Sequence, residues 1–298
     1  MIYDEIGHWP LENSMRLPRP LLSLITLTYA AFARVVACVY FCRPVKTRAS
    51  RRFYHLWLPQ RSSLYHLWCV FRQFQNFTTI HADRCRTTFG LEPAFTSEGL
   101  ERLQQTMTTG QGSILLMSHV GNWEMAARLL AQRLPGLKLL LYMGEKEKEG
   151  IEKSQKDGLR RQGITVAALG RDENDPFRAI SGLRLLQEGG VVSLAGDMVW
   201  QENQRFIEVD FLSGRARLPE APFAFALASG VPVFAFFAFR TGRNRYHFRL
   251  SEAIYVKAAG RAERRQAMDE AAQSYAALLE QAVCEYPCQW YHFDDFWR

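Results

Sequence analysis

The chain has 298 residues, of which 48% are hydrophobic, and it carries 37 Lys and Arg against 30 Asp and Glu, for a formal net charge of +7. A chain of this length and hydrophobic content can bury a substantial core, which excludes an intrinsically disordered protein. The basic excess favours anionic partners such as acidic lipid surfaces or acidic carrier proteins. The basic residues are spread along the chain and match no zinc-finger, RNA-recognition or helix-turn-helix pattern, so we do not expect nucleic acid as a partner.

An apolar stretch at residues 20–42 follows a proline-broken lead-in. It is long enough to cross a bilayer, which takes about 20 residues, but Arg34 lies inside it and basic residues flank it on both sides. We therefore expect a membrane-associated helix, either tilted across the bilayer or lying in the interface with Arg34 reaching the headgroups. A buried core helix of a large soluble domain is the alternative interpretation.

Residues 46–89 are dense in Arg, His and aromatic residues, and their apolar residues recur at helical spacing, which predicts a helical hairpin. Trp, Tyr and Arg suit a lipid headgroup boundary, and they suit helices packed on a sheet equally well, so both interpretations stay open. We divide the chain into an N-terminal membrane-associated helical region, residues 1–95, and a catalytic domain, residues 96–298.

Short apolar runs alternate with helical patterns from residue 113 onward. We expect strands at residues 114–117, 137–142, 164–168, 191–195, 232–239 and 246–250, and helices from about residue 122 and at residues 145–161, 176–187 and 261–284. This alternation predicts an α/β fold with a sheet covered by helices on both faces.

His119 stands where a buried strand gives way to a helix, a position at which α/β folds expose functional side chains. Glu124 follows five residues later. Inside one helix the two side chains would point about 140° apart. If Gly121 lets the backbone turn tightly before the helix, Glu124 falls in the first helical turn and reaches back to the imidazole, where a carboxylate would fix the tautomer of a catalytic histidine.

Each of these residues also has a purely structural interpretation. Glu124 could cap the free amides of the helix start, and His119 could be a hydrogen-bonded histidine at a strand end. Asp197 ends another buried strand after Gly196, and we expect it to be either a residue of the site or a turn-forming aspartate.

The block at residues 118–124 resembles the His-x4-Asp/Glu motif of the lysophospholipid acyltransferase superfamily, in particular the branch of bacterial lipid A biosynthesis (lauroyl/myristoyl) acyltransferases. The chain also resembles that branch at residues 195–197, 209–216, 218–222 and 227–233, which follow the order of its conserved blocks, and at its C-terminal motif, residues 287–290 with Phe293 and Trp297. The resemblance covers residues 100–298. It implies a mixed sheet flanked by helices, as in glycerolphosphate acyltransferases.

The resemblance further implies transfer of a fatty acyl group from an acyl carrier protein or CoA thioester to a hydroxyl of a lipid or glycolipid, such as a lipid A precursor. His119 would be the general base and Glu124 its orienting carboxylate. A thioester is already activated, so we expect neither a metal nor a bound cofactor, and the acyl-carrier or CoA thioester serves as co-substrate. The expected location is the cytoplasmic face of the bacterial inner membrane.

Further residues in these blocks are candidates for substrate binding. Arg215 and Arg217 could hold a phosphate of the pantetheine arm or of a lipid headgroup, with solvated surface arginines as the alternative. We include Asn122, Asp197 and Glu220 in the same group because they lie in the matching blocks.

Other chemistries fit less well. Cys284, Cys288 and His292 recur every four residues, but Pro287 breaks the helix that would align them as metal ligands. No zincin helix or Gly-x-Ser-x-Gly elbow is present in the sequence. The six cysteines form no disulfide pattern, and no secretory signal is recognisable, which favours a reducing compartment. A lipid hydrolase and an inactive lipid-binding protein on the same fold remain the alternative functions.

Overall fold

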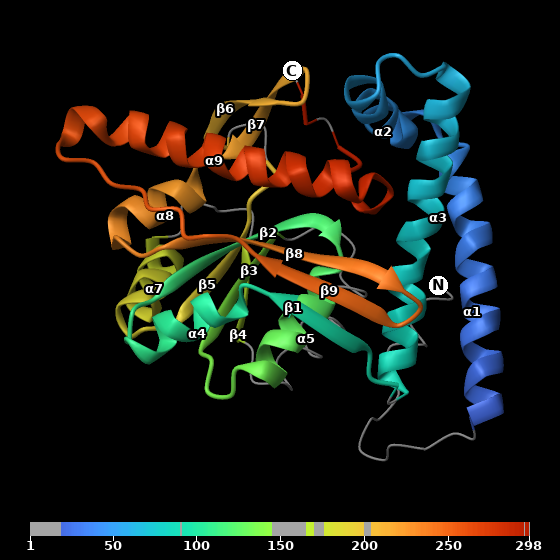
Figure 1. Ribbon diagram of the computed structural model, residues 1–298, viewed down its shortest axis with the longest axis horizontal. Coiled ribbons are helices and arrows are strands. Elements are labelled where there is room, and N and C mark those ends of the chain that lie inside the picture. Colours follow the sequence, from blue (N-terminus) through green and yellow to red (C-terminus); the bar gives the residue numbers. More distant parts are fainter. Residues whose placement is uncertain are drawn as a thin grey trace.

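The computed structural model describes residues 19–89, 91–144, 165–169, 176–199, 204–294 and 296–297. Within them, helices cover both faces of a central sheet, and a group of N-terminal helices stands along one flank of it (Figure 1). The predicted helix at residues 145–161 lies outside the described residues.

Seven of the described strands form one sheet in the order β1-β9-β8-β2-β5-β3-β4. Neighbouring strands in this sheet are parallel except for β8 and β9, which are antiparallel. The predicted mixed sheet is therefore confirmed. The strands are β1 (Ala94–Glu98), β2 (Ser113–Gly121), β3 (Leu139–Gly144), β4 (Thr165–Leu169), β5 (Val191–Ala195), β8 (Val233–Gly242) and β9 (Arg245–Leu250).

Residues 114–117 of the central strand β2 form an apolar run because both faces of the strand are buried there. Ile114 and Leu116 join a hydrophobic cluster on one side of the sheet, and Leu115 and Met117 join a second cluster on the other. Successive side chains of a strand point to opposite faces, so a run without alternation is the pattern of a strand covered on both sides. The covering helices are α4 (Leu100–Thr108) and α5 (Trp123–Arg133) on one face, with α8 (Ala221–Ser229) and α9 (Arg264–Glu285) on the other.

Three helices precede the sheet: α1 (Arg19–Phe41), α2 (Pro44–Trp57) and α3 (Ser63–Thr88). The predicted helical hairpin is therefore confirmed as α2 and α3. Residues Pro20–Phe41 are long and apolar enough to cross a membrane, and only 17% of the most apolar window is buried. That exposure contradicts the interpretation of this segment as a buried core helix.

Several elements were not predicted. They are β1 at the sheet edge, α4, α8, and a two-stranded antiparallel hairpin of β6 (Phe206–Phe211) and β7 (Gly214–Pro219). The helix α7 (Pro176–Gln187) and strand β5 have the predicted bounds. The domain division between residues 95 and 96 stays a prediction, although strand β1 runs across it.

Candidate active site

His119 lies near the carboxyl end of β2, where the strand becomes irregular. The pairing of β2 with β8 shifts register between Met117 and Gly121, and Gly121 has a φ of 72°. A Cβ atom at Gly121 would lie 1.8 Å from the Ala238 carbonyl oxygen, so only glycine allows this close approach. The predicted tight turn at Gly121 is confirmed. It lets α5 begin at Trp123, with the Asn122 side chain capping it by accepting from the Met125 amide at 3.3 Å.

The carboxylate bonded to the His119 ring is Asp197, which follows β5. His119 Nδ1 lies 2.9 Å from Asp197 Oδ1, and the His119 backbone amide donates to Asp197 Oδ2 at 2.8 Å. The Trp290 indole also donates to Asp197 Oδ2, at 3.0 Å. Asp197 is fully buried, whereas the His119 side chain is 25% exposed. The imidazole is thus held at Nδ1 by a buried, fully bonded carboxylate while part of the ring reaches the surface.

Electrostatics keep Asp197 ionised. Burial alone would raise the pKa of this carboxyl group, but the electrostatic interaction with His119 and the hydrogen bond to it, helped by His292 and Trp290, outweigh burial and hold the pKa at about 2. His292 lies next to this pair, with its ring centroid 6.0 Å from that of His119. Burial lowers the pKa of His292, so near neutral pH its imidazole stays uncharged beside the charged Asp197.

The C-terminal segment closes the site from the other side. Val120 forms a β-bridge with Trp290, and the Tyr291 amide donates to the His119 carbonyl at 2.8 Å. Backbone and side chain of His119 are therefore both fixed. Sequence reasoning grouped Trp290 with a family motif but did not place it, or His292, at His119.

The expected contact between Glu124 and His119 is corrected by this geometry. Glu124 does lie in the first turn of α5, but its Oε2 accepts from Arg84 Nε at 2.7 Å and its Oε1 from Arg128 at 3.5 Å. At the start of α5 the Glu124 side chain contacts Arg84 of α3. Asp197, just after β5, is the carboxylate that contacts the imidazole. Any catalytic contribution of Glu124 stays a prediction.

The structure places the remaining candidates as follows. Asn122 is 2% exposed and donates to the Tyr246 hydroxyl at 3.3 Å, so its described contacts are structural. Arg215 is exposed on the β6–β7 hairpin and bonds Asp210 at 2.9 Å, and Arg217 lies 4.3 Å from the centre of the Phe206 ring. Their role as phosphate binders stays a prediction.

Glu220 lies just before α8. It accepts from Arg265 at 2.9 Å and faces Arg205 at 3.8 Å. It is thus engaged by two arginines, and a contact with substrate stays a prediction. Of the seven candidates, the structure unites His119 and Asp197 through direct hydrogen bonds.

The partner of His119 had a signal in the sequence. His119 lies near the carboxyl end of β2 and Asp197 lies just after β5, and adjacent parallel strands bring their carboxyl ends to one edge of the sheet. This signal can be used only when the strand order is known, because it depends on β5 lying next to β2 in the sheet. Strand order is set by packing over the whole sheet, and it is not written in local sequence patterns.

A family model described as bacterial lipid A biosynthesis acyltransferase matches residues 61–298. Among curated proteins, the chain is similar to the phosphatidylinositol mannoside acyltransferase of Mycobacterium tuberculosis strain H37Rv, at 27% identity over 201 residues. The protein of the same name from strain CDC 1551 is 26% identical over 201 residues. Each match covers 67% of this chain and 58% of the relative, so the chain spans little more than half the length of these relatives.

Proposed function

Because the chain belongs to the bacterial lipid A biosynthesis acyltransferase family, we propose that it transfers a fatty acyl group from a thioester to a hydroxyl of a lipid acceptor at a membrane surface. The observation that carries this proposal is the bond between His119 Nδ1 and the buried carboxylate of Asp197. A histidine held in this way has its proton on Nδ1 and its lone pair on Nε2, which is the state that a general base requires.

In the proposed reaction, Nε2 of His119 removes the proton from the acceptor hydroxyl as that oxygen attacks the thioester carbonyl carbon. The new C–O bond forms, and the carbonyl oxygen gains negative charge in the tetrahedral intermediate. The C–S bond then breaks, and the departing sulfur takes the proton from Nε2 to leave as a thiol. Asp197 stays ionised throughout and stabilises the imidazolium that exists between the two proton transfers.

The developing oxyanion needs positive partial charge nearby. The N-terminus of α5 begins four residues after His119, and the free amides and dipole of a helix start favour negative charge. We propose that this helix start supplies the stabilisation. The thioester is activated already, so the scheme needs no metal ion and no covalent enzyme intermediate.

The donor and acceptor follow from chemistry and from the relatives. We propose an acyl carrier protein or CoA thioester as donor, because the basic chain suits either anionic partner. We propose a glycolipid hydroxyl as acceptor, since the curated relatives are named for a phosphatidylinositol mannoside. The apolar helix α1 supports a location at a membrane, and we propose the cytoplasmic face of the bacterial inner membrane, where acyl carrier protein and CoA are available.

One experiment separates transfer from its alternatives. Membranes containing the protein are incubated with a thioester labelled in its acyl group. Label in lipid supports transfer, label in free fatty acid indicates a hydrolase, and intact thioester indicates an inactive binding protein. His119→Ala should abolish transfer, and its matched control is His247→Ala, a histidine on β9 that contacts Thr96 and Glu98. Unchanged turnover in His119→Ala would overturn the mechanism.

A further inference from the structure

The orientation of α1 follows from the way α3 is bound on its two sides. Figure 1 shows α3 between α1 and the sheet, with α1 and α3 running side by side. Gln75 of α3 donates to the Arg34 carbonyl at 3.4 Å and to Cys38 Sγ at 3.3 Å, and Phe41 meets Phe71 with ring centroids 5.4 Å apart. These contacts fix an antiparallel register between the two helices.

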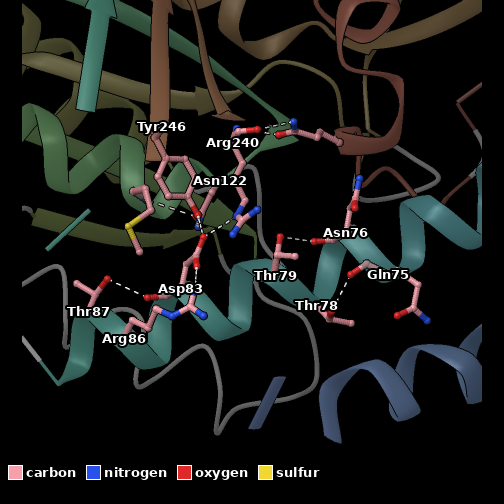
Figure 2. A network of polar contacts seen from close by, with 12 residues as sticks. Gln75, Asn76, Thr78, Thr79, Asp83, Arg86, Thr87, Asn122, Arg240 and Tyr246 are labelled. Carbon is pink, nitrogen blue, oxygen red and sulfur yellow. Dashed lines mark hydrogen bonds and ion pairs between the residues drawn. The ribbon is translucent and has the colours of Figure 1, made fainter. Parts of the chain in front are cut away.

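On its other side, α3 is bound to the catalytic domain by buried charges. Asp83 is fully buried, and its carboxylate accepts from Arg86 at 2.7 Å, from Arg240 at 2.7 Å and from the Tyr246 hydroxyl at 2.8 Å (Figure 2). Arg84 reaches Glu124 at 2.7 Å. Two amides of α3 add to this, because Gln73 donates to the Trp290 carbonyl and Asn76 to that of Cys288. These bonds hold α3 against the catalytic domain.

The register between α1 and α3 determines how deep in a bilayer the charged residues of α3 would lie if α1 crossed it. Cys38 lies beside Gln75, and Asp83 lies eight residues further along α3, about 12 Å at the rise of an α-helix. The same distance back along α1 reaches residue 30, near the middle of Pro20–Phe41. If α1 crossed a bilayer, Asp83, Arg84 and Arg86 would sit near the membrane centre together with the domain they bind. Ionised groups at that depth are strongly disfavoured.

The exposed surface of α1 fits a helix lying flat instead. Its exposed large apolar residues lie on the side away from the buried Leu22, Thr26 and Ala37, with Tyr29 at the border, and they are Leu21, Leu24, Leu27, Tyr29, Phe32, Val35 and Val39. Arg34 is exposed and, at about 100° per residue, lies at the edge of that apolar side. An interfacial helix has this arrangement, with apolar residues in the acyl boundary and a cation at the rim that reaches the headgroups.

Charge identifies the kind of membrane. Residues 19–82 contain nine Lys and Arg and not one Asp or Glu, in a chain that has 30 acidic residues. The exposed ones among the described side chains are Arg34, Arg43, Arg48, Arg51, Arg61 and Arg72. Trp68 is exposed in the first turns of α3, as in proteins that place aromatic rings at the headgroup level. A surface that has basic side chains and no acidic ones is complementary in charge to anionic lipid headgroups.

We propose that α1 lies in the plane of an anionic membrane surface, with its apolar side in the acyl boundary and the cations of α1–α3 on lipid headgroups, and that it does not span the bilayer. This goes beyond the membrane association included in the proposed function and does not depend on acyl transfer. It places His119 on the same side of the bilayer as both ends of α1.

Depth measurement tests this orientation in the full-length chain. A fluorescent amino acid is placed at Leu24, Phe32 or Val39 and quenched by lipids brominated at shallow or deep acyl positions, with Ile180 on α7 as an exposed apolar control. Equal, shallow quenching at the three α1 positions is expected, with none at Ile180. Deep quenching at Phe32 and shallow quenching at both flanking positions would mean a spanning helix and overturn the proposal. Fluorescence that brominated lipid does not quench at any of the three positions, as expected if α1 is covered by a second copy of the chain, would overturn the proposal as well.

Binding to vesicles tests the charge. Vesicles of phosphatidylglycerol and phosphatidylcholine should bind the protein at least tenfold more tightly than pure phosphatidylcholine. Arg48→Glu with Arg51→Glu should remove most of that difference, whereas Arg261→Glu with Arg264→Glu, the same charge change at exposed positions near the start of α9, should alter binding less than twofold. Equal effects of the two double variants would overturn the headgroup assignment. Thioester consumption in detergent reports on the proposed acyl transfer separately.

Discussion

Replacing Asp197 by Asn should abolish most of the activity without removing the local hydrogen bonds. The amide oxygen of Asn can still accept from the His119 amide and from Trp290, as Asp197 Oδ2 does. The amide nitrogen then faces His119 Nδ1 at the position of Oδ1 and donates to it. That donation moves the imidazole proton to Nε2, and Nε2 can no longer act as a base.

The size of the effect follows from the charge that is lost. Two unit charges about 4 Å apart interact by about 4 kcal/mol at the effective dielectric of a protein surface. Removing the carboxylate should therefore raise the activation barrier by about 3–5 kcal/mol, which corresponds to a decrease in kcat of roughly 10²- to 10⁴-fold.

The loss of the carboxylate also changes the stability of the fold. The pKa of Asp197 is about 2, below its ordinary value of 3.8, so the carboxylate stabilises the fold above pH 3.8, and this contribution is lost as the pH falls towards 2. At neutral pH it amounts to about 2 kcal/mol.

The assay is the initial rate of label transfer from the thioester to lipid, with kcat and KM measured separately. Glu124→Gln is the comparison, because Gln still accepts from Arg84 and the carboxylate it replaces is not bonded to the imidazole in the structure. We expect Glu124→Gln to retain activity within about tenfold of the parent. If Asp197→Asn keeps nearly full kcat while Glu124→Gln loses two orders of magnitude, the assignment of the carboxylates is reversed and our reasoning is refuted.

Three further substitutions test the surrounding structure. Burial, reinforced by the charge of Arg84, lowers the pKa of His81 to about 4, so the folded protein loses stability as the pH falls from 6.5 to 4, by an amount on the order of 3 kcal/mol. In His81→Phe this loss should be absent from urea unfolding compared at pH 7 and pH 4.5, and an unchanged loss would contradict it. Tyr246→Phe removes the hydroxyl between Asp83 and Asn122 and should cost about 1–2 kcal/mol of unfolding free energy and lower kcat more than it changes KM; a change in KM alone would argue against a role in holding α5. Gly121→Ala should destabilise by about 3 kcal/mol or more, and an unchanged melting temperature would show that the tight turn is not required.

Sequence reasoning found the elements that local patterns specify. The strand at β5, the helix α7, the turn at Gly121 and the long apolar helix all follow from spacing, glycine and hydrophobic periodicity. It found the histidine for the same reason, since a His after an apolar strand and before a glycine turn is visible locally. It predicted a contact of the imidazole with Glu124, the nearer carboxylate in the chain, whereas the structure shows Asp197 bonded to the ring.

The physical reason for that error is topological. The contact of His119 with Asp197 depends on β5 lying beside β2, and the contact of Trp290 with Asp197 depends on the C-terminal segment crossing the same edge. These contacts join residues 78 and 93 positions apart, and no local periodicity encodes them. The β6–β7 hairpin was missed for a related reason. Its strands have only six residues each, and the alternation of buried with less buried residues is complete in β6 but not in β7, so the pattern is too short to distinguish from a loop.

The corrected position of Glu124 changes the interpretation of the whole N-terminal region. The glutamate in the His-x4-Glu block binds Arg84, and Asn122 of the same block reaches Asp83 through Tyr246, so two of its residues connect α5 to α3. Near the middle of α3, Gln73 donates to the carbonyl of Trp290, the residue whose indole donates to Asp197. Helix α3 therefore contacts the segments on both sides of His119, namely α5 and the C-terminal segment at Trp290. The face of α3 away from the sheet packs against α1. A chain truncated before residue 44 would keep the His119–Asp197 pair and the α2 residues Phe53 and Tyr54, which are buried in the core, and would lose only α1. Its thioester consumption with a soluble acceptor should therefore persist while transfer to membrane lipid falls.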